Sequence, residues 1–123
     1  MPADLPETAA LVAGSAFVRR SETPWEQPAQ GVRRQVLGHG SDLMIVRVEF
    51  EQGAIGALHH HPHRQASHIV SGRFAVTVGA ECTELQAGDS FYAEGNTVHG
   101  VRAIEAGVLL DVFTPIREDF LAR

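Results

Sequence analysis

The sequence predicts an all-β, single-domain protein, and three observations support this fold class. The chain has 123 residues, a length typical of one domain with one core. In the segment 42–50, apolar and polar residues alternate, so the apolar ones share one face, as in a half-buried strand. Short apolar runs then recur along the chain with glycines between them. Many short strands at such spacing indicate a small β-barrel or β-sandwich.

The chain is predicted to divide into an N-terminal extension, residues 1–30, and a β domain, residues 31–123. Four prolines make the extension irregular, with one short helix expected near Glu7 to Ala13. Pro115 is expected to end the last strand, and the segment Arg117 to Ala122 to form a short helical turn.

The β domain is expected to begin near Val32. Glycines separate most of its predicted strands, and Gly79 and Gly88 mark two tight turns. The predicted strands are 42–50, 55–58, 67–70, 74–78, 82–85, 90–93, 98–103 and 108–113.

Composition restricts the partners and the compartment. The formal net charge is −5, and the ten basic residues, all arginine, are scattered. Nucleic-acid binding needs clustered cations, so we expect no nucleic-acid partner. Cys82 is the one cysteine, which excludes an intrachain disulfide and favours a reducing cytoplasm. The apolar stretch 9–18 is shorter than a membrane span and follows acidic residues, so we expect neither a signal peptide nor a membrane anchor.

The segment 59–65, His-His-His-Pro-His-Arg-Gln, collects imidazoles and an amide at the spacing of metal ligands, and His99 follows downstream. His59 and His61 point to one face of a strand, and Gln65 has the same parity if the chain stays extended. We predict one mononuclear site with His59, His61, Gln65 and His99 as ligands. Neutral nitrogen and oxygen donors suit Ni, Zn, Fe, Co, Mn or Cu to different degrees, so the metal stays open.

Other interpretations of these histidines remain. The whole segment could be a solvated loop that binds metal incidentally. His60 has the opposite parity and is expected to face outward. His63, after Pro62 in the turn, and His68 are expected at the surface or at the rim of the pocket.

The spacing of glycines and ligands in this region resembles the first motif of the cupin superfamily, with glutamine in place of the usual glutamate. The matching residues are Gly53, His59, His61, Gln65 and Gly72. The second cupin motif is less regular: Gly88 and His99 fit, but Glu94 and Asn96 stand where proline and glycine are usual. The resemblance implies a small double-stranded β-helix, or jelly-roll barrel.

An acidic residue, Asp111, interrupts the apolar run near the C-terminus. A carboxylate at such a position is costly unless it is paired or used. Strand parity places Leu109, Asp111 and Phe113 on one face, and closure of a barrel would turn that face towards the metal.

This run resembles the KdgF family, small cupins of pectin and alginate degradation, together with the segments 24–26, 31–34, 53–56 and 71–74. Members convert 4,5-unsaturated monouronates into their linear keto form. The resemblance implies that Asp111, Phe113 and Arg117 are functional in such an enzyme, with a small anionic sugar as substrate. Asp111 would shuttle a proton, Arg117 would bind the substrate's carboxylate, and Phe113 would pack against the sugar ring.

Structural roles compete with these functional ones: Asp111 could pair with an arginine, Phe113 could be core, and Arg117 could cap carbonyls or bind Glu118. Two other functions also stay open on this fold, a metal-dependent dioxygenase and a non-enzymatic sugar-acid-binding module or sensor. Exposed strand edges and the N-terminal arm lead us to expect a homodimer.

Overall fold

The structure is a computed structural model and describes residues 15–121. The helix predicted near Glu7 to Ala13 lies outside these residues. A 3₁₀ turn, η1 (Arg20–Glu22), precedes the strands, and a short helix, α2 (Glu118–Leu121), follows them. The strands are β1 (Glu26–Ala29), β2 (Val32–His39), β3 (Met44–Phe50), β4 (Ile55–His59), β5 (Arg64–Val78), β6 (Glu81–Gln86), β7 (Ser90–Ala93) and β8 (His99–Thr114). The predicted all-β class and the C-terminal helical turn are confirmed.

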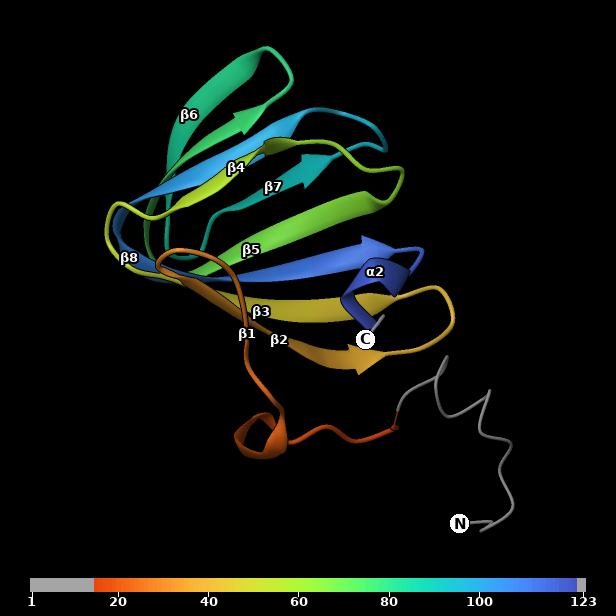
Figure 1. The fold of residues 1–123 in the computed structure, drawn as a ribbon. Helices are drawn as coiled ribbons and strands as arrows, with labels where there is room; N and C mark the ends of the chain where they lie inside the picture. Colours follow the sequence, from red (N-terminus) through yellow and green to blue (C-terminus); the bar gives the residue numbers. More distant parts are fainter. Residues whose placement is uncertain (1–14, 122–123) are drawn as a thin grey trace, which may run out of the picture.

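Two long strands, β5 and β8, run antiparallel to each other and belong to both layers of the fold (Figure 1). In one layer, the second half of β8 pairs with β3 and the first half of β5 pairs with β7, while β1 and β2 extend the edge. In the other layer, the first half of β8 pairs with β4 and the second half of β5 pairs with β6. The result is a jelly roll with a core between two facing sheets.

Glycines bend these two strands instead of ending them, which corrects the sequence-based strand boundaries. The segments 67–70 and 74–78 belong to one strand, β5, and the predicted segments 98–103 and 108–113 join in another, β8, which begins at His99. Gly72 has a φ of +84°, and a Cβ on it would lie 2.5 Å from the carbonyl oxygen of Ala106. Only glycine allows the two bent backbones to approach so closely.

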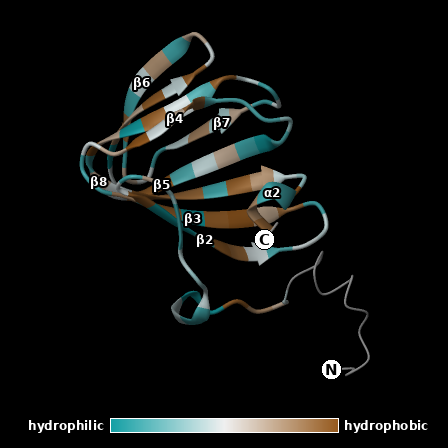
Figure 2. Cartoon of the chain, in the orientation of Figure 1, coloured by the Kyte–Doolittle hydropathy of each residue, from teal (hydrophilic) through white to brown (hydrophobic). Residues whose placement is uncertain are grey.

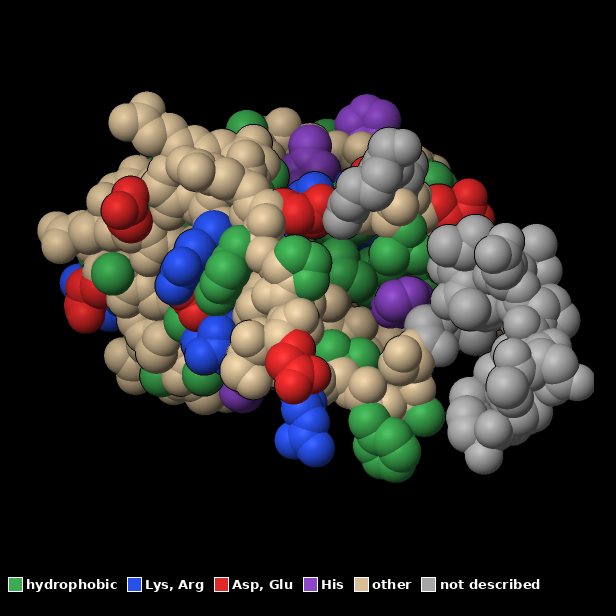
Figure 3. All heavy atoms as spheres, turned by 60° about the horizontal axis from the view of Figure 1, so that its bottom comes forward, with side chains coloured by type: hydrophobic (Ala, Val, Ile, Leu, Met, Phe, Trp, Pro, Cys, Tyr) green, Lys and Arg blue, Asp and Glu red, His purple; other side chains and the backbone are tan. Residues whose placement is uncertain are grey.

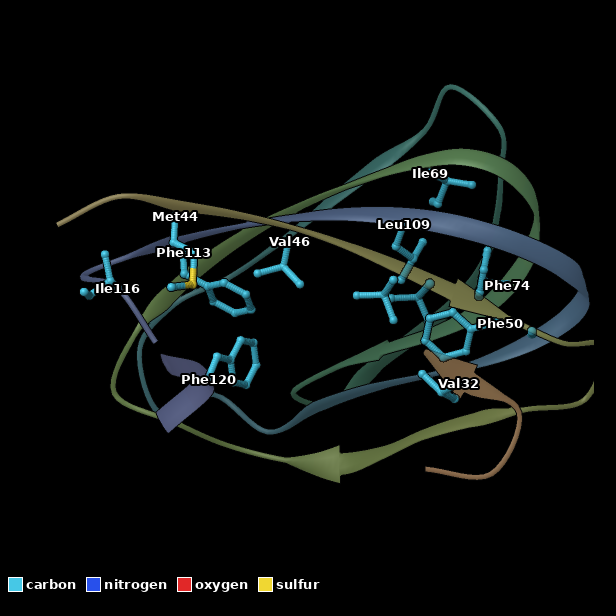
Figure 4. Packing of buried hydrophobic residues seen from close by; sticks show 13 residues of the cluster. Val32, Met44, Val46, Phe50, Ile69, Phe74, Leu109, Phe113, Ile116 and Phe120 are labelled. Carbon is cyan, nitrogen blue, oxygen red and sulfur yellow. The ribbon is translucent and has the colours of Figure 1, made fainter. Parts of the chain in front are cut away.

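The inner faces of both layers form the core. Strand β3 alternates between buried and half-buried residues, as its sequence predicts, and Figure 2 shows it as mostly hydrophobic. The core has two ends (Figure 4). Phe50 packs edge-on against Phe74 at one end, and Phe113 packs edge-on against Phe120 of α2 at the other. Burying such aromatic rings contributes roughly 1.5–3 kcal/mol each.

Both tight turns are confirmed. Val78 and Glu81 are paired across a two-residue turn in which Gly79 has a φ of +60°, and Gly88 has a φ of +95°. Pro115 follows the end of β8, as predicted.

The sheet begins earlier than the predicted domain boundary, because β1 lies within residues 1–30 and pairs with β2. The buried side chain of Gln35 holds the preceding segment by donating to the backbone carbonyls of Arg20 and Thr23, at 3.0 and 2.8 Å. The described part of the extension is therefore attached to the sheet.

Charges on the surface are mixed. On the face shown in Figure 3, arginine side chains lie beside acidic ones; among the described residues, Arg33 pairs with Glu49, and Arg73 with Glu84 and Glu105. Within residues 15–121 no helix is long and apolar enough to cross a membrane. The homodimer, the cytoplasmic location and the absence of a nucleic-acid partner stay predictions.

Candidate functional site

Three imidazoles meet between the two layers. His59 ends β4 and lies directly opposite His99, the first residue of β8, while His61 lies in the loop that follows β4. One nitrogen from each ring lies within 4.8 Å of the others. His61 and His99 are buried, at 7 % and 3 % exposure.

The hydrogen bonds of the three rings define their tautomers. In each ring Nδ1 contacts a backbone carbonyl oxygen at 2.8, 3.0 and 2.8 Å, belonging to Ala57, His63 and Thr97 respectively. A carbonyl oxygen only accepts, so Nδ1 carries the proton and the lone pair of Nε2 is left for a ligand. Burial lowers the pKa of His61 to about 4 and also lowers the pKa of His99. These two rings are therefore neutral at neutral pH.

Gln65 completes the cluster from strand β5. Its Oε1 lies 3.1 Å from Nε2 of His61 and 3.0 Å from Nε2 of His99. The chain turns between His61 and β5, so Gln65 does not extend the strand of the histidines, and the parity reasoning behind its prediction was wrong. It reaches the site because β5 folds back beside the second half of β8.

This donor set fits a cation. With Nδ1 protonated, the Nε2 atoms and the Gln65 oxygen are all acceptors, and they converge without a donor between them. The amide nitrogen of Gln65 donates to Ser67 Oγ at 2.9 Å, which keeps the amide oxygen turned towards the imidazoles. Neutral imidazoles and an amide oxygen are ligands for a divalent transition ion.

Asp111 lies opposite Ser67 across the β5–β8 pair. Ser67 Oγ donates to Asp111 Oδ1 at 2.6 Å. Burial raises the pKa of Asp111 to about 6, and the hydrogen bond from Ser67 acts in the opposite direction. Among the described residues, Ser67 and, to a smaller extent, Gln65 supply its hydrogen bonds, and the arginine of the structural alternative, Arg117, acts on it only through its charge. A carboxyl group with this pKa can gain and lose a proton near neutral pH.

A cavity of about 400 Å³ opens beside this cluster and brings the predicted residues together. Five of the seven predicted site residues line it: His59, Gln65, Asp111, Phe113 and Arg117. The other two, His61 and His99, contact Gln65. By contrast, His60 and His68 are exposed, in agreement with their expected surface positions.

Arg117 and Phe113 have structural contacts as well as positions on the cavity wall. Arg117 donates from Nε and Nη2 to the two carboxylate oxygens of Asp119, at 3.0 and 2.8 Å, so its acidic partner is Asp119 and not Glu118. Phe113 is 2 % exposed, and its ring centroid lies 5.7 Å from those of His61 and Phe120. It is therefore part of the core and of the wall at once.

Sequence reasoning missed two residues at this site, Ser67 and Arg34. Ser67 bridges Gln65 and Asp111, a role that depends on the register of β5 against β8. Arg34 lines the cavity from β2. The sequence does indicate this position, because Arg34 alternates with Val32 and Val36 on the strand and so shares their inward face.

Comparison with known proteins agrees with this architecture. The family model described as Cupin domain matches residues 46–113, more than half of the chain. The pectin degradation protein KdgF of Dickeya dadantii (strain 3937) is 43% identical over 102 residues, which cover 81% of this chain and 93% of that protein. The chain is a cupin of the KdgF family.

Solved structures related to this KdgF-family cupin share its fold over most of the chain. KdgF from a Halomonas species is 36% identical, with a TM-score of 0.82, over 86% of this chain and 98% of that one. An RmlC-like cupin from Shewanella frigidimarina is 38% identical, with a TM-score of 0.85, over 89% of this chain and 98% of that one. The recognition of a cupin resembling KdgF is thus confirmed.

Proposed function

We propose that this KdgF-family cupin opens the ring of 4,5-unsaturated monouronates and yields their linear keto form. The observation that supports it best is Asp111, a carboxyl group with a pKa of about 6 on the wall of the cavity that also contains the histidine cluster. The Dickeya dadantii relative is named a pectin degradation protein, and pectin is built from uronates, which supports this substrate class.

The reaction needs one group that first takes and then returns a proton. The substrate is a cyclic enol ether with a hemiacetal hydroxyl on C1. Ionised Asp111 accepts the proton of that hydroxyl, the C1 oxygen forms an aldehyde, and the bond between C1 and the ring oxygen breaks with its electron pair moving to that oxygen. Asp111 then returns the proton to C4, and the former ring oxygen becomes the ketone on C5. The step is an isomerisation, in which no atom is gained or lost.

The hydrogen bonds of Asp111 suit this role. Ser67 donates to Oδ1 and holds the carboxyl group in place on the cavity wall, where it exchanges the proton with the substrate. Because its pKa is raised to about 6, both the ionised and the protonated form of Asp111 are populated near neutral pH. Arg117 and Phe113 line the same cavity, where a guanidinium would bind the carboxylate and an aromatic ring would pack against the sugar.

His59, His61, His99 and the amide oxygen of Gln65 would hold the divalent ion. All four ligands are neutral, so a bound ion would retain its full charge and supply strong Lewis acidity towards the anionic oxygens of the substrate. The geometry of the ligands suits several metals and does not select one.

The test follows the loss of enol-ether absorbance of a freshly released unsaturated monouronate, under nitrogen, with metal-loaded protein. The proposal expects a faster decay with protein than without it. Asp111→Asn should keep the metal and lose about 10²–10⁴-fold in rate, the usual range for a general acid–base. His99→Ala should lose both metal and activity, whereas Asp42→Asn, an exposed turn residue, should lose neither.

The same assay separates the other functions. A dioxygenase would be inactive without oxygen, and a binding module would bind the uronate and leave its spectrum unchanged. A decay that the protein does not accelerate would reject the proposed function.

A further inference from the structure

Arg34 occupies an unusual position for an arginine. It lies on the inner face of β2 between Val32 and Val36, and its direct neighbour on β3 is Val48. Val32 is part of the hydrophobic core, and both Val32 and Val48 line the cavity together with Arg34. A cation on an apolar inner face is costly unless it is paired or binds something.

The hydrogen bonds of Arg34 leave part of its guanidinium for a ligand. Nε donates to Glu26 Oε1 at 3.1 Å, and Cζ lies 3.7 Å from the centroid of the Phe120 ring. Within the part of the chain that the structure describes, the guanidinium of Arg34 makes its hydrogen bond to protein through Nε. Its two terminal nitrogens thus remain as donors, in a geometry that matches a carboxylate.

The second arginine of the cavity is differently engaged. Arg117 also stacks on Phe120, with Cζ 4.2 Å from the ring centroid, but its Nε and Nη2 atoms already hold Asp119. The carboxylate partners of both arginines, Glu26 and Asp119, are not lining residues of the cavity. Two guanidinium groups therefore face the cavity, the carboxylates that they hold lie outside its wall, and Asp111 is the one acidic residue among the lining residues.

We propose that Arg34 binds the carboxylate of the substrate and makes the cavity select a sugar acid over its uncharged analogue. Arg34 then shares with Arg117 the anchoring that the sequence assigned to Arg117 alone. The substrate class in this inference rests on the proposed function. The choice of Arg34 as the binding residue rests on its position on the cavity wall and its contact with Phe120.

A purely structural role for Arg34 is the competing explanation, since it ties β1 to β2 and packs on α2. Arg33 provides a matched control for that role. It directly precedes Arg34 on the same strand. It donates to Glu49 from Nε and Nη2 at 3.0 and 2.8 Å, and its Cζ lies 3.8 Å from the ring centroid of Trp25. Arg33 thus has the same kinds of contact, but it is not a lining residue of the cavity beside the histidines.

The experiment measures equilibrium binding of D-glucuronate and D-glucuronamide to the full-length, metal-loaded protein by calorimetry. The two probes differ only at C6, where glucuronamide has a neutral carboxamide in place of the carboxylate. The wild-type protein should prefer glucuronate. Arg34→Met should weaken glucuronate binding by about 10- to 100-fold, the value of a charge-assisted hydrogen bond, and change glucuronamide binding less than about twofold.

Two further variants keep the test decisive if Arg34→Met is poorly folded. Arg34→Lys keeps the charge without the planar fork and should recover part of the preference for glucuronate. Arg33→Met should keep the wild-type preference. The inference is wrong if the wild-type protein does not prefer glucuronate, or if the preference is unchanged in both Arg34 variants. Turnover of the unsaturated uronate is a separate measurement, so the proposed function can fail or hold independently.

Discussion

Replacement of Ser67 by alanine tests the bridge between Gln65, the proposed metal ligand, and Asp111, the proposed proton-exchanging group. Ser67 is 2 % exposed, and its hydroxyl accepts from Gln65 and donates to Asp111. Alanine removes only this hydroxyl and leaves a buried amide N–H and a carboxyl oxygen without their partner. Each such group costs about 1–3 kcal/mol, and Asp111 can relieve part of its cost by binding a proton. We therefore expect Ser67→Ala to lower the free energy of unfolding by about 2–4 kcal/mol.

The same change should alter the pH dependence of activity. The hydrogen bond from Ser67 lowers the pKa of Asp111, so its loss raises that pKa above about 6 and moves the acid limb of kcat/KM to higher pH. Urea unfolding measures the first effect and the kinetic pH profile measures the second. Ser71→Ala is the matched control, since Ser71 is an exposed serine on the same strand. Equal stability of the two variants, together with an unchanged pH profile, would refute the bridging role.

Two further predictions concern acid stability and the bend in the sheet. In the metal-free protein, the pKa of His61 falls from 6.5 to about 4, so the unfolded chain binds a proton that the folded protein does not, and stability is lost as the pH falls through this window. The pKa of Asp111 rises from 3.8 to about 6, which gives the opposite effect between these values. The metal-free Asp111→Asn variant should therefore lose more stability than the metal-free wild-type protein when the pH falls from about 7 to about 5. Urea unfolding in the presence of a chelator measures both losses. A loss in the variant that is equal to or smaller than that of the wild type contradicts the two shifts. Gly72→Ala should lower the free energy of unfolding by about 2–5 kcal/mol, because the new Cβ adds backbone strain and clashes with a backbone carbonyl. Gly53 has nearly the same φ, but no atom would lie within 4 Å of a Cβ there, so Gly53→Ala should cost only about 1–2 kcal/mol. Equal melting curves for the two variants would count against the close approach of β5 and β8.

Much of this site was predictable because its residues carry local signals. The spacing of His59 and His61 and the carboxylate of Asp111 inside an apolar strand each mark a residue that a hydrophobic core would not otherwise contain. Arg34 carried the same kind of signal, since an arginine alternates there with two valines. Parity along a strand identifies the face of Asp111 and of Arg34, whereas His61 lies in the loop after β4 and was found through its spacing from His59.

The contacts of Ser67 and Arg117 could not be predicted in this way. A serine on a strand has no distinctive pattern, and its link to Asp111 follows from the pairing of β5 with β8 across 44 positions of sequence. Arg117 had two acidic residues close in sequence, and the geometry after Pro115 directs it to Asp119.

The amino-acid sequence by itself determined the all-β class, the turns at Gly79 and Gly88, and which residues bring imidazole, amide and acidic groups to the site, because alternation and residue chemistry are local properties. Only the tertiary structure decided that the two longest strands continue through the point where Gly72 of β5 meets Gly107 of β8, that Gln65 reaches the histidines from a different strand, and that Arg34 faces the same cavity as Asp111. These features depend on strand register and on close approach of distant backbones, and such contacts are set by packing of the whole sheet.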